Sequence, residues 1–282
     1  MSATAGTADA GQPFVAGRRQ SATRRNLNLL RELALTQFKL KYTGSVLGYL
    51  WSLFKPALLF GIMYVVFVHL LKAGSATPEF PVQLLLGVVL WTFFVEATSS
   101  AMNSIAGAGG LIQKAYFPRW ILVLASIAAA LITFLINASL IIVITIPIHH
   151  MHPGLRSLLA PLFILELALL VVGLALLLSS AFVFYRDVGH IWEIITLVLF
   201  YGSAVVYPFT ILHNQVLRVV AGINPLAQII EDLRHALVSP GVPWMESVLG
   251  GLYVIPLAAV LVLFIGGVIT FRRLTPRFAE YL

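Results

Sequence analysis

NSIAGAGGLIQKAYFPRW, residues Asn103–Trp120, is a short polar interruption between two apolar runs that are each long enough to cross a membrane. The interruption must therefore lie at a membrane surface. Gly107, Gly109 and Gly110 favour a bent chain, and Pro118 stops any helix before the next apolar run begins. The residues between them predict a short amphipathic helix, which is small enough to dock into a groove of another protein.

The composition is that of an integral membrane protein. Hydrophobic residues make up 60% of the 282 residues and charged residues only 10%, against about 25% charged residues in soluble domains. The net charge of +7 would suggest a nucleic-acid partner in a soluble protein. Here the cations stand beside apolar runs, so they indicate orientation in the membrane and no nucleic-acid partner. Cys is absent, which excludes disulfides, thiolate metal sites and a Cys nucleophile.

The N-terminal region divides into two parts. Residues 1–22 are small and polar and predict a disordered cytoplasmic tail without the pattern of a cleaved signal peptide. Residues 23–42 place leucines on one side and cations, among them Arg24, Arg25 and Arg31, on the other at helical spacing. This pattern predicts a basic amphipathic helix lying along the inner membrane surface.

Residues 43–282 predict an all-α integral membrane domain. We expect six transmembrane helices per chain, at about 47–71, 82–102, 119–148, 157–185, 191–207 and 248–271, with the polar segment 103–118 between the second and third. The segment 210–247 predicts two short helices broken at Gly222–Pro225, of which Asn224 caps the second and Pro225 begins it. We expect these two helices to be re-entrant on the outer side, where they dip into the outer leaflet or lie on it and are protected by neighbouring protein.

The distribution of cations predicts the orientation. When loops are assigned alternately, the side that holds both termini receives all of the 18 Lys and Arg residues except Lys72, Arg156, Arg218 and Arg234. Both termini are therefore expected in the cytoplasm, and this bias supports an even number of crossings.

Four stretches resemble the ABC-2 type permeases that export polysaccharides such as O-antigen, teichoic acid, capsule and galactan. They are residues 39–56, residues 91–119, Tyr185-Arg186-Asp187 followed by Tyr207-Pro208, and Asn224-Pro225-Leu226. One departure is Ala106–Gly110, where many members of that family have polar residues, often Asn.

The resemblance implies the membrane subunit of an ATP-driven exporter of a lipid-linked polysaccharide in the bacterial plasma membrane. A second copy of the chain would complete a homodimer, and two separate ABC ATPase subunits would hold the ATP and Mg, leaving this chain without a cofactor or catalytic residues. The sequence agrees, because it contains no Gly-x-x-x-x-Gly-Lys-Ser/Thr loop. The resemblance assigns the coupling helix that inserts into the ATPase to 103–118, with Leu111, Ile112, Gln113, Lys114 and Tyr116 as contact residues.

Two groups of residues are candidates for substrate contact. Lys39, Lys41, Tyr42, Lys55 and Arg186 fall near the inner headgroups, where cations can bind a pyrophosphate by charge-assisted hydrogen bonds; the alternative is ordinary positive-inside anchoring. Trp91, Tyr201 and Tyr207 can line a channel whose outer gate includes Asn224 and Pro225, whereas the alternative is packing or contact with lipid.

The acids Glu96 and Glu166 lie within apolar spans and should face protein or water, because a charge facing lipid is costly. A hydrogen-bonded structural acid is favoured over a proton relay at both positions. His149, His150 and His152 predict an outer loop rather than a metal site, because no carboxylate accompanies them in sequence.

Three other functions fit the sequence less well. An ABC-2 drug or lipid exporter fits the spans but usually has a longer outer loop or a different coupling sequence. An integral-membrane glycosyl or acyl transferase would need an acid–base pair at one membrane face, such as Asp-x-Asp, which is not present. An ion-driven secondary transporter would show an internal repeat with paired broken helices.

Overall fold

A computed structural model describes residues 22–45, 47–48, 50–70, 79–110, 117–149 and 154–281. Every regular element in this part of the chain is a helix, as predicted. The predicted tail up to residue 21 and residues 111–116, which carry the predicted coupling contacts, lie outside the described residues.

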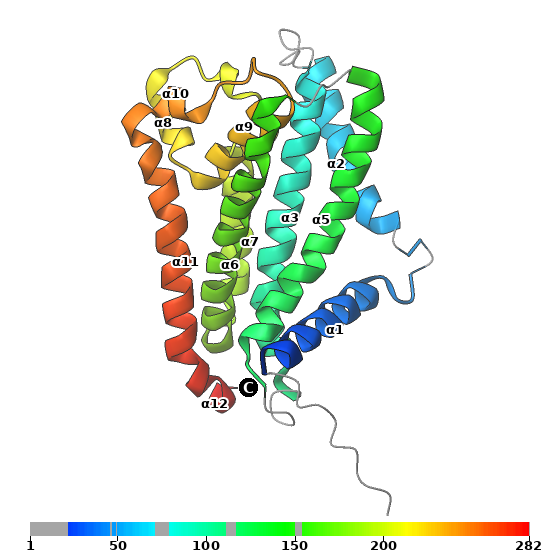
Figure 1. Cartoon of the computed structure of the whole chain (residues 1–282), viewed down its shortest axis with the longest axis vertical. Coiled ribbons are helices and arrows are strands. Elements are labelled where there is room, and N and C mark those ends of the chain that lie inside the picture. The colour runs from blue at the N-terminus through cyan, green and yellow to red at the C-terminus, as the bar shows by residue number, and fades with distance from the viewer. Residues whose placement is uncertain are drawn as a thin grey trace, which may run out of the picture.

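Six helices form a bundle along the long axis of the molecule (Figure 1). They are α2 (Leu50–Tyr64), α3 (Phe80–Gly107), α5 (Trp120–His149), α6 (Ala160–Phe184), α7 (Val188–Gly202) and α11 (Val254–Leu274). A π-helical stretch, Val65–Leu70, extends α2, and 3-10 turns at Leu155–Leu159, Phe209–Ile211, Gly250–Tyr253 and Thr275–Arg277 flank the other helices.

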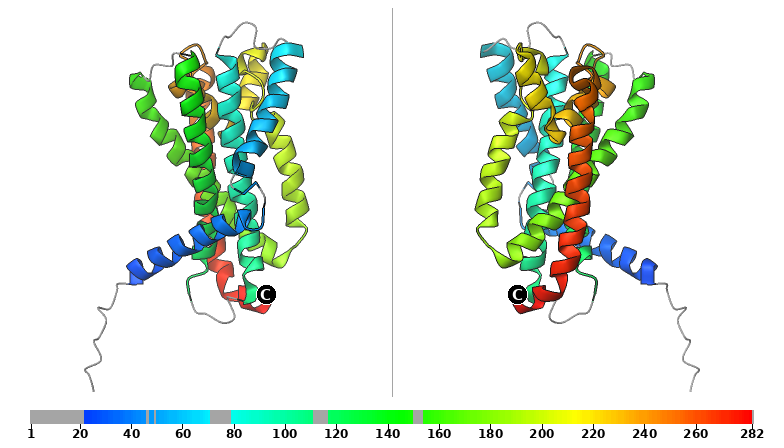
Figure 2. Two further views of the ribbon diagram at one scale, coloured as in Figure 1. Left: turned by 90° about the vertical axis from the view of Figure 1, so that its right-hand side faces the viewer. Right: turned by 90° about the vertical axis from the view of Figure 1, so that its left-hand side faces the viewer.

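The two ends of the bundle differ in their short helices. Helix α1 (Ala22–Tyr42) lies obliquely across one end, which also carries α12 (Phe278–Tyr281) and the C-terminus (Figures 1 and 2). The other end is covered by α8 (Gln215–Gly222), α9 (Pro225–Leu237) and α10 (Met245–Leu249). The predicted pair of short helices after residue 210 is therefore present as α8 and α9.

Five helical stretches of the described chain are long and apolar enough to cross a membrane: Leu50–Leu70, Phe80–Gly107, Trp120–Ser139, Leu155–Phe184 and Met245–Arg277. The span expected at 191–207 is not among these five stretches. Helix α7 is apolar but has only 15 residues, so it reaches about 22 Å at 1.5 Å per residue, short of the roughly 30 Å hydrocarbon core. Residues 203–208 continue it as irregular backbone.

The boundary of α3 also differs from the expected one. The polar interruption was expected to begin at Asn103, but the helix continues through Gly107. Asn103 and Ser104 do not break it, because their side chains donate hydrogen bonds to carbonyls of the same helix, those of Ser99 and Ala101. Ile105 is fully buried and ties this last turn to the bundle.

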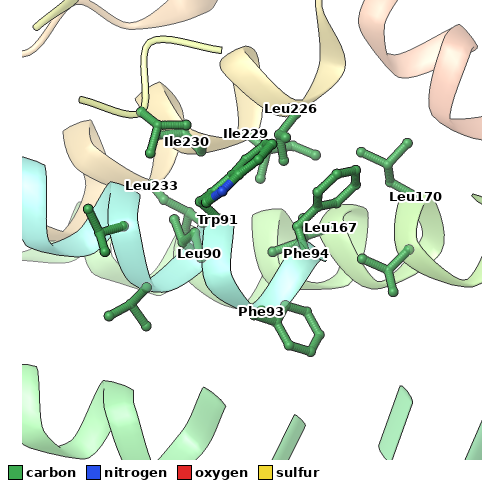
Figure 3. Close-up of a cluster of buried hydrophobic side chains, with 14 of the residues drawn as sticks. Leu90, Trp91, Phe93, Phe94, Leu167, Leu170, Leu226, Ile229, Ile230 and Leu233 are labelled. Carbon is green, nitrogen blue, oxygen red and sulfur yellow. The ribbon is translucent and has the colours of Figure 1, made fainter. Parts of the chain in front are cut away.

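Helix α3 is the centre of the core. It packs against α2, α5, α6, α7 and α9, and its aromatic residues meet leucines of α6 and aliphatic residues of α9 (Figure 3). The labelled members of this cluster are Leu90, Trp91, Phe93, Phe94, Leu167, Leu170, Leu226, Ile229, Ile230 and Leu233. The short helix α9 is thus a buried part of the bundle rather than a loose cap.

Candidate functional site

A cavity of about 590 Å³ lies where the end of α1 meets α2 and α3. Its walls combine cations, aromatic rings and hydroxyl groups: Lys41, Tyr42, Ser45, Trp51, Ser52, Lys55, Pro56, Leu59, Trp91, Thr92, Val95, Glu96 and Ser99. Three of the predicted pyrophosphate contacts and one predicted channel aromatic are therefore brought to one place. We refer to this space as the basic cavity.

The turn after α1 positions the cations of the basic cavity. Helix α1 ends at Tyr42, and the Thr43 hydroxyl donates to the carbonyl of Lys39 at 2.8 Å. Gly44 then adopts a φ of 81°, which favours glycine because other residues are strained there. This turn directs the chain from the oblique α1 into α2, so that Lys41 and Lys55 reach the same cavity from two helices.

An ion pair crosses the cavity wall. The Lys41 ammonium lies 2.6 Å from Glu96 Oε1 of α3, and the Thr133 hydroxyl of α5 donates to the same oxygen at 3.2 Å. The side chains of Lys41 and Glu96 are 43% and 22% exposed. The prediction that Glu96 faces protein or water is confirmed, whereas its partner on α1 was not predicted.

The other predicted cations lie apart from this cavity. Lys39 is exposed on α1. Arg186 is exposed in the turn between α6 and α7, where its guanidinium lies 5.1 Å from the centre of the Phe182 ring. Neither residue lines the basic cavity. Arg24, Arg25 and Arg31 are exposed on α1.

A second, more open cavity of about 520 Å³ continues from the first between α2 and α7. Leu59, Trp91 and Val95 line both cavities, and the far wall of the second is formed by Glu193, Ile194, Thr196, Leu197 and Phe200 of α7. The Trp91 ring lies 5.3 Å from that of Phe200, which lies 5.2 Å from that of Tyr201. An aromatic row thus leads along α7 from the basic cavity toward Tyr201.

The predicted gate residues meet at the end of α7. Asn224 caps α9 by accepting from the Leu226 amide, and its amide group donates to the Ser203 hydroxyl at 2.9 Å. The Tyr207 hydroxyl donates to the Tyr201 carbonyl at 2.8 Å. Tyr201 itself is 57% exposed. Pro225 is the first residue of α9, as predicted.

Arg234 of α9 was not predicted as a functional residue, although it is the largest fully buried side chain among the residues that the structure describes. It donates to the carbonyls of Gln83, Ala204 and Val205 at 2.7–3.0 Å and to the Glu231 carboxylate at 2.6 Å. Two of these carbonyls belong to the irregular segment after α7, where Ala204 has a φ of 51°. The guanidinium fork therefore replaces the helical hydrogen bonds that this segment lacks.

A second buried polar group joins α6, α9, α10 and the 3-10 turn Gly250–Tyr253 that precedes α11. Asp232 accepts from Gln228 and Tyr253 at 2.8 Å each and from the Met245 amide at 2.9 Å. Gln228 also donates to Glu166 at 3.4 Å. Burial raises the pKa of the Asp232 carboxyl, whereas its three donors act in the opposite direction. This arrangement fits the prediction of a hydrogen-bonded structural acid at position 166.

The residues that directly follow the predicted coupling contacts are anchored on the C-terminal region. Phe117 packs against a cluster that includes Phe271 and Phe278, and the Arg119 guanidinium donates to the Thr275 carbonyl. The predicted contacts Leu111, Ile112, Gln113, Lys114 and Tyr116 lie outside the described residues. The segment that carries them therefore begins at the end of α3 and returns to the bundle beside the end of α11.

The fold and cavities define a multi-pass α-helical membrane protein whose apolar helices enclose a cavity that contains two lysines and a glutamate. Residues 28–238, more than half of the chain, match the family model described as "ABC-2 type transporter". The chain belongs to this family, and it is the membrane permease subunit of an ABC transporter rather than a catalytic domain.

Two similar proteins carry a more specific description. The O-antigen export system permease protein RfbA of Klebsiella pneumoniae is 26% identical over 257 residues, which cover 90% of this chain and 95% of that protein. The protein of the same name from Myxococcus xanthus is 23% identical over 222 residues, which cover 78% of this chain and 84% of that protein.

Proposed function

We propose that this chain exports a lipid-linked polysaccharide, of the O-antigen, galactan or teichoic-acid type, across the bacterial plasma membrane. The observation that carries the proposal is the basic cavity, in which two lysines and two tryptophans face one space. Ammonium groups bind phosphate by charge-assisted hydrogen bonds, and aromatic faces stack on sugar rings. The two similar permeases, both named for O-antigen export, support the same substrate class.

The proposed topology has six crossings with both termini in the cytoplasm. Helix α7 is the additional crossing, completed by residues 203–208. Irregular backbone is tolerated at membrane depth only where protein satisfies it, and the Arg234 fork supplies the required donors. The concentration of cations at the end of the bundle that holds α1 favours the cytoplasm for this end, with α1 lying on the inner surface and α8 and α9 re-entrant on the outer side.

The proposed assembly is a homodimer with two ABC ATPase subunits, which bind ATP and Mg. Helices α2 and α7 flank the second cavity and expose large apolar side chains, among them Phe54, Leu58, Ile62, Ile194, Leu197 and Val198. A second copy on this side would close the open cavity into a channel for the polymer. The exposed Arg24, Arg25 and Arg31 of α1, together with the segment 103–118, are the proposed ATPase contacts.

The coupling segment gives the first test of this assembly. Replacing Leu111 with Asp or Lys114 with Gln is expected to abolish ATP-dependent transport of lipid-linked polysaccharide in proteoliposomes, because each change removes a contact to the ATPase. The permease itself should still fold. As a control, Arg156→Gln removes an exposed cation at the other end of the bundle and should transport normally. A permease that forms no complex with an ABC ATPase, or that transfers sugar by itself, would contradict the proposal.

Lys55 gives a test of the substrate. Replacing Lys55 with Gln removes one cation of the basic cavity, and the apparent KM for the lipid-linked polysaccharide should rise about tenfold, which corresponds to one lost charge-assisted hydrogen bond. The maximal rate should change less. Lys39→Gln, a change outside the cavity, should have a smaller effect on KM. Equal effects at Lys39 and Lys55 would favour general surface attraction over a site in the cavity.

A further inference from the structure

The Lys41–Glu96 ion pair is also a wall between two cavities. Both residues line the basic cavity and, on their other side, a smaller cavity of about 200 Å³ between α1, α3 and α5. Gln37 and Ser100 line only the smaller one. Movement of Lys41 away from Glu96 would therefore open one space to the other and release the end of α1 from α3.

The two lysines of the basic cavity differ in their charge partners. Lys41 is held by Glu96 at 2.6 Å, whereas no ion pair is formed by Lys55 within the described part of the chain. Lys55 alone neutralises the charge of an anion that carries one negative charge. An anion with two or more charges, such as a pyrophosphate, is neutralised only when it also binds Lys41. It must then compete with Glu96 for the Lys41 ammonium group.

We propose that the Lys41–Glu96 pair senses a pyrophosphate group in the basic cavity. Lys41 exchanges the Glu96 carboxylate for the incoming anion, and Glu96 keeps the hydrogen bond from Thr133. Single-charge phospholipid headgroups leave the pair intact. This inference rests on the proposed function only for the identity of the natural ligand, a lipid-linked pyrophosphate.

The consequence of the exchange follows from the packing of α1. This helix packs mainly against α5, and its Leu33 contacts the cluster that contains Ile105, Leu122 and Phe278 at the ends of α3, α5 and α12. The same cluster holds Phe117, which directly follows Tyr116, the last of the predicted coupling contacts. Release of α1 from α3 would thus change the support of the segment that contacts the ATPase.

The absence of Cys from the chain allows a direct measurement. Replacing Gln37 and Ser100 with Cys places the only two thiols on opposite sides of the smaller cavity, one on α1 and one on α3. The rate of cross-linking by a short bis-maleimide is measured in nanodiscs of neutral phosphatidylcholine. Farnesyl pyrophosphate is the probe, farnesol is its neutral control, and its binding is measured separately by equilibrium dialysis.

Farnesyl pyrophosphate is expected to slow cross-linking about twofold to fivefold, the range that loss of a partly exposed ion pair can produce. Farnesol should have no effect, and neither should nanodiscs that contain phosphatidylglycerol. In a Glu96→Gln background, cross-linking should already be slow without probe and should not respond, while the affinity for farnesyl pyrophosphate rises. Glu32→Gln, which removes an exposed carboxylate from α1, should behave like the parent.

Several outcomes would overturn the inference. If farnesyl pyrophosphate does not bind, or if it binds without slowing cross-linking, Lys41 does not exchange Glu96 for the anion. If phosphatidylglycerol slows cross-linking as much as farnesyl pyrophosphate does, the Lys41–Glu96 pair does not distinguish anions by their charge. A response to inorganic pyrophosphate alone supports the exchange and assigns it to a free anion rather than to a lipid. Because the measurement needs no ATPase and no transport, failure of the exporter function is distinguishable from failure of the exchange.

Discussion

Replacing Arg234 with Met is expected to lower the free energy of unfolding by about 3–5 kcal/mol, the usual cost of removing one partner of a buried ion pair. Met preserves much of the volume, so the loss is electrostatic. Glu231 would be left buried without its counter-ion, and the carbonyls of Gln83, Ala204 and Val205 would lose their donor. Residues 203–208, which follow α7, should lose their fixed conformation first, because two of these carbonyls belong to them.

Thermal unfolding of the purified permease in one detergent measures this effect. Arg234→Lys keeps the charge but not the planar fork, and it should fall between the parent and Arg234→Met. Adding Glu231→Gln to Arg234→Met should recover part of the loss, because it removes the uncompensated carboxylate. Arg156→Met, at an exposed position, should stay within about 0.5 kcal/mol of the parent. An Arg234→Met protein as stable as the parent would show that the fork does not hold the end of α7.

Hydropathy predicted most of the bundle, because long apolar runs between polar loops are a strong signal. Hydropathy wrongly extended the helix of the fifth span through residues 203–207, because these residues are as apolar as the helix before them. No local property of Ser203 or Ala204 shows that the backbone leaves the helix there. The cause is a donor on α9, and the sequence shows Arg234 only as a cation on a short amphipathic helix.

The sequence indicated which residues could form the candidate site, but not which of these residues contact one another. Position near the inner headgroups selected Lys41 and Lys55, and hydropathy required Glu96 to face protein or water. The pairing of Lys41 with Glu96 joins residues 55 apart in sequence, and no periodicity specifies it. The cap formed by Asn224 was predictable because an Asn followed by Pro at a helix start is a local signal.

The contact between α6 and α11 leads to the second large expected effect. Gly173 and Gly267 lie where the two backbones touch: a Cβ at Gly173 would lie 2.6 Å from the Phe264 Cα and 2.7 Å from its amide nitrogen. A Cβ at Gly267 would collide with the Gly173 carbonyl. Backbone atoms cannot rotate away, so Gly267→Ala should force the helices apart and cost about 1–3 kcal/mol or more. Small residues at such crossings are a common basis of helix association in membranes.

The neighbouring glycine supplies the matched control. Gly266 lies one residue away on the same helix, and a Cβ there would meet nothing within 4 Å, so Gly266→Ala should be as stable as the parent or more stable, because Ala favours helix. Gly173→Ala should reproduce the loss seen at Gly267, and the double variant should lose less than the sum, because one separation of the helices relieves both clashes. Thermal unfolding and limited proteolysis of α11 measure all four variants. Equal stability of Gly266→Ala and Gly267→Ala would mean that α6 and α11 are not in backbone contact, and α11 would then have to be held by its contacts with α9 and by the Tyr253–Asp232 hydrogen bond.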